Sequence, residues 1–343
     1  MQIVISIVVT LLVLTGLVVA HEFGHYIVAK KRGIKVAEFA IGFGPKLIKW
    51  RRNETEFSIR PFFIGGFNRF ADDEEKDPVP GDFRAASLKS RFLTIIAGPA
   101  MNVIVAVILS VVVLMAAGTN QIAVHSVSAD SPAAQAGIQE GDIVKSYNGV
   151  DIQLQYDWQD AIGKQKTGDS LPLVIERDGK EMSPNVPYMQ NEDGQKLIGI
   201  EVNPYGPIKT FNFFEAIGLS FKWLFMVTRE MLQSLGQLFF MGQGIENMAG
   251  IVGVTQMVGT VAISGGFYSV LSLSALLSVN LAIVNLLPIP ALDGGKIVLY
   301  AVEGVRKKPA SPKVEGALNM IGMVLIFGLA IFLVFQDIHR MLV

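Results

Sequence analysis

The chain has 343 residues, which allows two or three domains. Hydrophobic residues make up 51% of it and the mean hydropathy is +0.44, which excludes an ordinary soluble enzyme. A net charge of −1 provides no overall field to attract nucleic acid, and the lack of cysteine excludes disulfide bonds and thiolate zinc ligands.

The first predicted element is a membrane helix that ends in a metal-binding motif. Residues 1–20 carry no charge, and we expect the helix to continue through an HExxH motif at His21, Glu22 and His25. On a helix, two histidines four residues apart share one face and can bind one Zn²⁺, while the glutamate activates the bound water. The position of the motif predicts a hydrolytic zinc site at bilayer depth. A helix end with polar caps is the alternative, but it accounts poorly for ionisable groups at that depth.

Four uncharged stretches reach the roughly 20 residues needed to cross a bilayer. They are residues 1–20, residues 92–124, a stretch within residues 247–292, and residues 316–336. A cleaved signal peptide is the alternative for the first, but basic residues follow it and none precedes it, which favours a retained anchor. Residues 30–91 hold fourteen Lys and Arg, and residues 306–313 are also basic. The positive-inside rule therefore predicts both loops in the cytoplasm, with both termini and residues 121–240 outside.

Between the first two spans, residues 36–70 predict short strands joined by turns. Glycine and phenylalanine are frequent there, and residues 56–60 alternate as in a half-buried strand. An exposed edge strand containing Gly65, Gly66 and Phe67 could hold a substrate as an extended strand, and a plain cytoplasmic hairpin is the alternative. The acidic run at residues 72–75 is predicted to be a solvated loop.

Residues 121–202 have a different composition, charged and with short β-like runs and many turns. Residues 125–149 contain the SPA, AG, GD and NG elements of a pattern that strongly resembles a PDZ domain. The block occurs once, which predicts a single PDZ domain. Such a domain receives strands or free chain ends by β-augmentation, so it could admit substrates whose outer domain has already been cut. A steric plug that binds no peptide is the alternative.

The segment at residues 211–240 has its polar side chains at helical spacing, against phenylalanine, leucine, tryptophan and methionine elsewhere. This pattern predicts an amphipathic helix on the outer leaflet. A fifth span is the alternative, but it would bury three or four charges.

The third predicted span ends at Asp293, the first charge after forty-six uncharged residues. Catalytic zinc usually takes three protein ligands, and the predicted topology puts this carboxylate at the same depth as the HExxH motif. We expect Asp293 to be the third ligand, with a helix-terminating Asp-Gly turn as the alternative. Two prolines break the helix just before it, and Asn285 could hydrogen-bond a substrate amide. The other histidines, His125 and His339, show no metal-like spacing and are predicted to be ordinary surface residues.

HEFGH on the first span, together with NxxPxPxLDGG on the third, resembles the site-2 protease family of intramembrane zinc metalloproteases. Residues 98–102, Gly-Pro-Ala-Met-Asn, also resemble the GPxxN signature of its bacterial RseP-type branch, and the resemblance covers nearly the whole chain. One departure is that residues 249–253 lack a proline that the family often shows. The resemblance implies a membrane-associated β element beside the active site. It also implies the following roles: Zn²⁺ ligands His21, His25 and Asp293; general base Glu22; and substrate-binding residues Asn285, Asn102, Gly65, Gly66 and Phe67.

The predicted fold is a polytopic α-helical membrane protein with about four transmembrane helices, a membrane-associated β element and an inserted extracytoplasmic PDZ domain. The expected segments are a first helix with HExxH (1–31), a cytoplasmic loop with the β element (32–90), a second helix (91–118), the PDZ domain (119–204), an interfacial helix region (205–245), a third segment with the LDG motif (246–303), and a cytoplasmic loop with a fourth helix (304–343).

The function that these features predict is a zinc-dependent endopeptidase that cuts transmembrane segments of single-span proteins within the lipid bilayer. By resemblance, its substrates are membrane-anchored anti-sigma factors or signal-peptide remnants in a bacterial inner membrane. Two alternatives from other classes are a metal-ion transporter and a catalytically inactive scaffold. A transporter needs neither a PDZ domain nor the order and spacing of residues in HExxH. A scaffold has no reason to retain both metal-binding motifs.

Overall fold

The computed structural model describes residues 2–71, 78–163, 168–190, 196–245, 248–308 and 310–342. It divides into two compact units, residues 1–109 with 227–343, and residues 110–226. Four helical segments in the described ranges are long and apolar enough to cross a membrane: Gln2–Lys31, Leu88–Ala116, Ile251–Leu286 and Lys313–Leu342. The chain is therefore a membrane protein with four candidate spans, as predicted. The acidic run at residues 72–75 lies outside the described residues.

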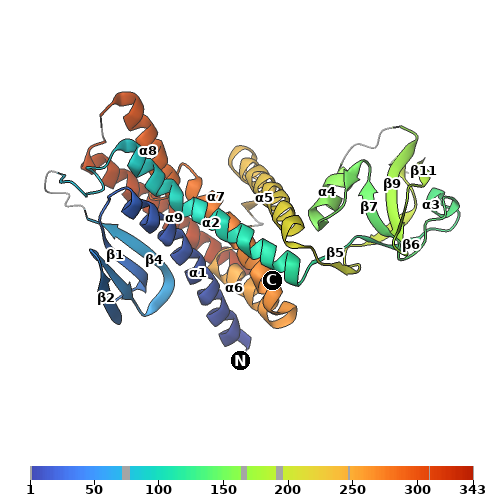
Figure 1. Ribbon diagram of the computed structural model, residues 1–343, viewed down its shortest axis with the longest axis horizontal. Coiled ribbons are helices and arrows are strands. Elements are labelled where there is room, and N and C mark those ends of the chain that lie inside the picture. The colour runs from blue at the N-terminus through green and yellow to red at the C-terminus, as the bar shows by residue number, and fades with distance from the viewer. Residues whose placement is uncertain are drawn as a thin grey trace. The chain divides into compact units, whose positions relative to one another are not determined.

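The first unit begins with helix α1 (Gln2–Lys31), which carries the HExxH motif in its second half. A four-stranded sheet follows, in the order β2-β3-β1-β4. Its strands are β1 (Val36–Phe43), β2 (Ile48–Arg52), β3 (Thr55–Ile59) and β4 (Phe62–Phe70). Strands β1 and β3 are parallel and the other pairs are antiparallel. The edge strand β4 lies along α1 (Figure 1), so the sheet presents one edge to the helix that carries the motif.

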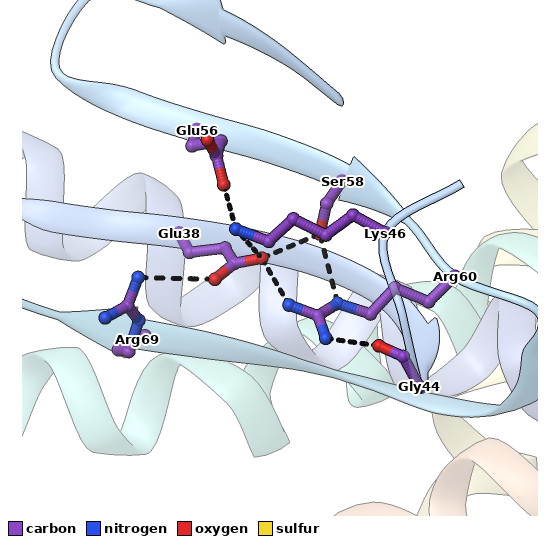
Figure 2. Close-up of polar contacts among 7 residues, drawn as sticks. All are labelled: Glu38, Gly44, Lys46, Glu56, Ser58, Arg60 and Arg69. Carbon is purple, nitrogen blue, oxygen red and sulfur yellow. Dashed lines mark hydrogen bonds and ion pairs between the residues drawn. The ribbon is translucent and has the colours of Figure 1, made fainter. Parts of the chain in front are cut away.

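A buried carboxylate holds this sheet together. The Glu38 side chain on β1 is only 3% exposed, and Arg60, Arg69 and Lys46 point toward it (Figure 2). Arg60 and Ser58 donate to Glu38 Oε1 at 2.6 and 2.8 Å. Burial by itself would raise the pKa of Glu38, but the hydrogen bonds from Arg60, Ser58 and Lys46 outweigh it and lower the pKa to about 2. Within the described residues, the side chains that contact the Glu38 oxygens are all donors, so this carboxylate has a structural role in the sheet.

The remaining helices of the first unit follow the sheet and the loop. They are α2 (Leu88–Ala116), α6 (Ile251–Thr260), a π-helical turn (Val261–Gly265), α7 (Gly266–Leu286), α8 (Asp293–Arg306) and α9 (Pro312–Leu342). The predicted third span is therefore broken at Gly266, whose φ of +74° favours glycine. The 21 residues of α7 are about 30 Å long, enough to cross the hydrocarbon core alone.

The start of α6 is the place where the family's proline is missing. No side chain of its own caps this helix. Instead Asp337, a buried residue on α9, accepts hydrogen bonds from the Gly250 and Gly253 amides at 3.2 and 2.8 Å. A carboxylate from another helix thus satisfies the free amides at this helix start.

The second unit is built on a seven-stranded sheet with two short helices, α3 (Pro132–Gln135) and α4 (Gln155–Gly163). The main path of the sheet runs β10-β9-β7-β6-β14, with β8 on β7 and β11 on β9. These strands are β6 (Ala123–Val127), β7 (Ile143–Tyr147), β8 (Val150–Asp151), β9 (Ser170–Arg177), β10 (Lys180–Met182), β11 (Asn185–Pro187) and β14 (Ile200–Asn203). Two small ribbons pair β12 (Met189–Gln190) with β13 (Lys196–Leu197), and β5 (Thr119–Asn120) with β15 (Ile208–Lys209).

Residues of the PDZ-like pattern have local structural tasks in this unit. Ser131 caps α3 by accepting a hydrogen bond from the Ala134 amide. Asn148 and Gly149 have φ of +52° and +73° in the turn between β7 and β8, where such angles are needed. Asp142 is buried and pairs with Arg177 at 2.6 Å. The pattern therefore marks a helix cap, a hairpin turn and an ion pair with a buried aspartate.

The predicted amphipathic helix is α5 (Phe213–Gly236), which continues into a π-helical turn at Gln237–Met241. It is not among the four candidate spans in the described part of the chain. Its position on the outer leaflet stays a prediction.

Candidate metal centre

Two glycines let α2 approach the histidine pair closely. A Cβ on Gly24 of α1 would lie 2.2 Å from the Ala97 carbonyl oxygen of α2. A Cβ on Gly98 of α2 would lie 2.3 Å from His25 Nε2 and 2.7 Å from His21 Nε2. Any larger residue at either position would separate the helices or displace the histidines, so the glycine of the GPxxN signature has a steric task at this site.

Three potential ligand atoms meet at this place. His21 Nε2 is 3.0 Å and His25 Nε2 is 3.3 Å from Asp293 Oδ2, and the two nitrogens are 3.1 Å apart. Tetrahedral zinc, with bonds of about 2.0–2.2 Å, holds its ligand atoms about 3.3–3.5 Å apart. Asp293 Oδ2 is buried and has no hydrogen-bond donor in the described part of the chain. An orphaned carboxylate oxygen facing two imidazole nitrogens at this spacing fits a zinc ion.

The outer ring nitrogen of each histidine is held by α2. His25 Nδ1 is 2.8 Å from the Thr94 carbonyl oxygen, which can only accept, so the proton of His25 is on Nδ1 and Nε2 is free to bind metal.

Asn102 holds the other histidine. Its Nδ2 is 3.0 Å from His21 Nδ1, and the residue is fully buried. Its Oδ1 is also buried and has no hydrogen-bond partner among the residues that the structure describes. A histidine that binds metal through Nε2 carries its proton on Nδ1, and a half-turn of the amide brings Oδ1 to accept it. The prediction that Asn102 binds substrate is untested, and this geometry favours a role in orienting His21.

Asp293 is delivered by a tight loop between α7 and α8. The chain leaves α7 at Leu287, passes two prolines, and enters α8 with Asp293 as its first residue. A Cβ on Gly294 would lie 2.1 Å from the Leu287 carbonyl oxygen, so only glycine lets α8 fold back against the end of α7. At the other end of α8, Arg91 on α2 forms a two-point ion pair with Glu303. This anchors the helix that carries Asp293.

Glu22 lies beside the histidines. One of its carboxylate oxygens and a ring nitrogen of each histidine lie within 4.8 Å of one another. Glu22 is held by Asn68 on β4, which sequence reasoning missed. The Asn68 side-chain amide donates to Glu22 Oε2 at 2.8 Å and to its carbonyl oxygen at 2.6 Å, and the Asn68 backbone amide donates to Oε2 at 3.1 Å. An uncharged polar residue directly after Gly65, Gly66 and Phe67 was the signal that could have revealed it.

The structure brings the other predicted substrate-binding residues to two places. Gly65, Gly66 and Phe67 lie on edge strand β4, where Phe67 packs against Phe43 and under the Arg60 guanidinium. Asn285 lies in the last turn of α7, eight residues before Asp293, and is half-buried. Its side chain forms no hydrogen bond within the described ranges.

A membrane protein with two histidines and an aspartate facing one another, and a glutamate beside them, belongs to the class of membrane metallohydrolases. Comparison with known families agrees, because the model of peptidase family M50 matches residues 9–329, and the chain belongs to that family. A protein of Clostridium acetobutylicum named as a zinc metalloprotease is 32% identical over 97% of each chain. Zinc metalloprotease RasP of Geobacillus kaustophilus is 29% identical over 98% of each chain. A protein of Enterococcus faecalis named protease eep is 31% identical over 97% of this chain and 99% of its own.

The predicted family and the zinc cofactor are therefore confirmed: the chain is a multi-pass membrane zinc metalloprotease. The transporter and scaffold alternatives are not retained.

Proposed function

We propose that this protein cleaves transmembrane segments of single-span membrane proteins, in regulated intramembrane proteolysis. The observation that carries the proposal is the convergence of His21 Nε2, His25 Nε2 and Asp293 Oδ2 within 3.0–3.3 Å of one another, with both histidines on a helix of membrane length. A hydrolytic site at that depth is of use only to a substrate that is itself in the membrane.

In the proposed mechanism, His21, His25 and Asp293 hold the zinc ion and Glu22 is the general base. When bound, zinc acts as a Lewis acid that polarises the scissile carbonyl and lowers the pKa of a coordinated water. Glu22 would take a proton from the attacking water and pass it to the leaving amide nitrogen. Thr94 and Asn102 keep the two imidazoles in the tautomer that leaves Nε2 free.

The substrate is proposed to bind as an extended strand at the open edge of β4. Proteolysis needs an extended backbone, because a helix keeps its carbonyls in internal hydrogen bonds. β4 is the last strand of its sheet within the described residues, so no strand pairs with its side away from β1. On that side Phe63 and Asn68 use backbone groups to bond α1, which leaves the stretch between them, at Gly66, for a substrate strand. The Asn285 side chain on α7 makes no hydrogen bond within the described residues, so it is available to a substrate amide.

The second unit is proposed to be the single PDZ domain, outside the cytoplasm. The capped helix, hairpin turn and sheet described above support this assignment. It could bind a free chain end by strand addition or exclude substrates with large outer domains. Both actions restrict cleavage to proteins that another protease has already trimmed.

The proposed location is the inner (cytoplasmic) membrane of a bacterium, with the active site towards the cytoplasm. The basic loop at residues 30–91 supports this orientation. Membrane-anchored anti-sigma factors and signal-peptide remnants are the proposed substrates, because both keep a single span after an outer cut.

The test is cleavage of a tagged single-span substrate without an outer domain, by purified protein in liposomes. Wild type is compared with Glu22→Gln, and with Glu140→Gln as a matched change at an exposed glutamate. We expect about one zinc per chain in all three, and cleavage by wild type and Glu140→Gln only, since a lost general base costs about 10²–10⁴ in rate. Zinc without cleavage by wild type, across several such substrates, would contradict the proposal.

A further inference from the structure

Hydrogen bonds join the edge strand β4 to α1 at two places. Near the start of the strand, the Thr15 hydroxyl donates to the Phe63 carbonyl oxygen at 2.6 Å. Near its end, Asn68 donates three hydrogen bonds to Glu22. Both contacts attach the strand to the helix, but only the second one touches the group proposed to act as the base.

The three bonds from Asn68 restrain Glu22 unequally. Two of them end on Oε2, at 2.8 and 3.1 Å, and the third ends on the carbonyl oxygen of the residue. No donor in the described part of the chain bonds to Oε1. One carboxylate oxygen is therefore held, and the other is left free to take a proton. A glutamate side chain has several rotatable bonds, so without such a clamp much of its time is spent in other rotamers.

The same contact sets the register of the β4 edge. Asn68 lies opposite Phe39 on β1. Its backbone N–H is bonded to Glu22, so the two residues form a non-hydrogen-bonded pair, in which the backbone groups of Asn68 face away from β1. The regular pairing continues to Ile41 and Gly66, so the backbone groups of Gly66 face the same open side. Gly66 lies two residues, or about 7 Å, from the point where Glu22 closes the edge.

We propose that Asn68 is the positioning residue of the general base, and that it fixes Glu22 in register with a substrate strand paired at Gly66. The amide holds one oxygen of the carboxylate and so aims the other. The Asn68 backbone N–H is already bonded to Glu22, so a substrate strand can pair with β4 at Gly66 but not at Asn68. The scissile bond of the substrate would therefore lie where this pairing ends, next to the Glu22 carboxylate. This inference rests on the proposed function, since it assumes a peptide substrate and Glu22 as base.

The first test measures kcat and KM for cleavage of the single-span substrate in liposomes by wild type, Asn68→Ala and Asn68→Asp. Asn68→Ala removes two of the three hydrogen bonds. Asn68→Asp keeps the size of the side chain but replaces the donor with an acceptor that faces the Glu22 carboxylate. We expect kcat to fall about 10–100-fold in Asn68→Ala and at least as far in Asn68→Asp, with KM within about threefold and zinc content unchanged.

Thr15→Val is the matched control. It removes the other hydrogen bond between α1 and β4 but does not touch Glu22. We expect its kcat to stay within about twofold of wild type, since one hydrogen bond contributes about 1 kcal/mol to stability. An equal loss of kcat in Thr15→Val and Asn68→Ala would mean that docking of the strand is what matters, and would overturn the proposal.

A second readout does not depend on turnover. A peptide hydroxamate binds zinc and donates a hydrogen bond to the base, so its affinity reports the aim of Glu22. We expect binding to weaken about 10-fold or more in both Asn68 variants, and to be unchanged in Thr15→Val. Full activity of Asn68→Asp, or loss of zinc from both variants, would sink the inference. If the wild-type protein does not cleave, the proposed function fails. If wild type and both Asn68 variants cleave equally well and Glu22→Gln does not, the proposed function stands and only the role of Asn68 fails.

Discussion

Two carboxylates in the first unit, Glu38 and Asp293, have opposite surroundings. Glu38 faces two arginines, a lysine and a hydroxyl, all of which donate (Figure 2). Asp293 faces two imidazole nitrogens, at least one of which is an acceptor because its ring proton is bonded elsewhere. A carboxylate among donors is a finished structural centre, whereas a carboxylate among acceptors needs a cation to hold the group together. The hydrogen-bonding character of the neighbours, more than burial, distinguishes a metal-binding carboxylate from a structural one.

The largest expected effect comes from removing the carboxylate among acceptors. Asp293→Ala leaves two histidine ligands, which should not retain zinc through purification. We expect zinc content to fall from about one per chain to near zero, and cleavage to be lost, with little change in the thermal stability of the zinc-free protein. Metal analysis and thermal unfolding with and without a chelator measure both effects. Full zinc occupancy in this variant would remove Asp293 from the ligand set.

Removing the carboxylate among donors should have the opposite signature. Glu38→Gln removes the negative charge that Arg60 and Arg69 face inside the sheet, while Lys46 keeps its ion pair with Glu56. Breaking such a pair costs about 3 kcal/mol, so we expect a clear loss of stability in detergent. Zinc content of the folded fraction should stay at the wild-type value. A variant as stable as wild type would show that solvent already screens this cluster.

A smaller effect is expected from the residue that orients His21. Asn102→Ala removes the amide next to His21 Nδ1, and loss of such an outer partner usually weakens metal binding about 10–100-fold. Ser278→Ala is the matched control, because Ser278 donates to the Asn102 carbonyl oxygen at 2.8 Å and leaves the amide in place. Competition with a zinc chelator measures the affinity. Equal weakening in both variants would assign the effect to packing of α2 against α7.

The comparison also explains how much the sequence could predict. The spans, HExxH and the late aspartate were predictable, because a bilayer demands a long apolar run and any charge next to it is conspicuous. Asn68 and Glu38 were not, because their partners depend on strand register and on how β4 docks against α1. Glu38 is the one charged residue of β1, and Asn68 stands beside Arg69 in β4; a few polar residues in an apolar strand fit many surroundings. The break at Gly266 was also missed, because one glycine in an apolar run does not specify a positive φ.

The smallest predicted effect is the pH dependence of the Glu38 cluster. Its pKa is lowered to about 2 in the folded protein, against an ordinary value of 4.5. Above pH 4.5 the carboxylate is charged in both the folded and unfolded states, and the cluster stabilises the fold fully. As the pH falls from 4.5 toward 2, the unfolded chain binds a proton that the folded chain does not, so stability is lost.

Other carboxyls titrate in the same range, so the quantity to measure is the difference in unfolding free energy between wild type and Glu38→Gln. We expect this difference to narrow from about pH 6 to about pH 3.5. A constant difference over that range would mean that the folded pKa of Glu38 is close to its ordinary value, and the contrast with Asp293 would then rest on geometry alone.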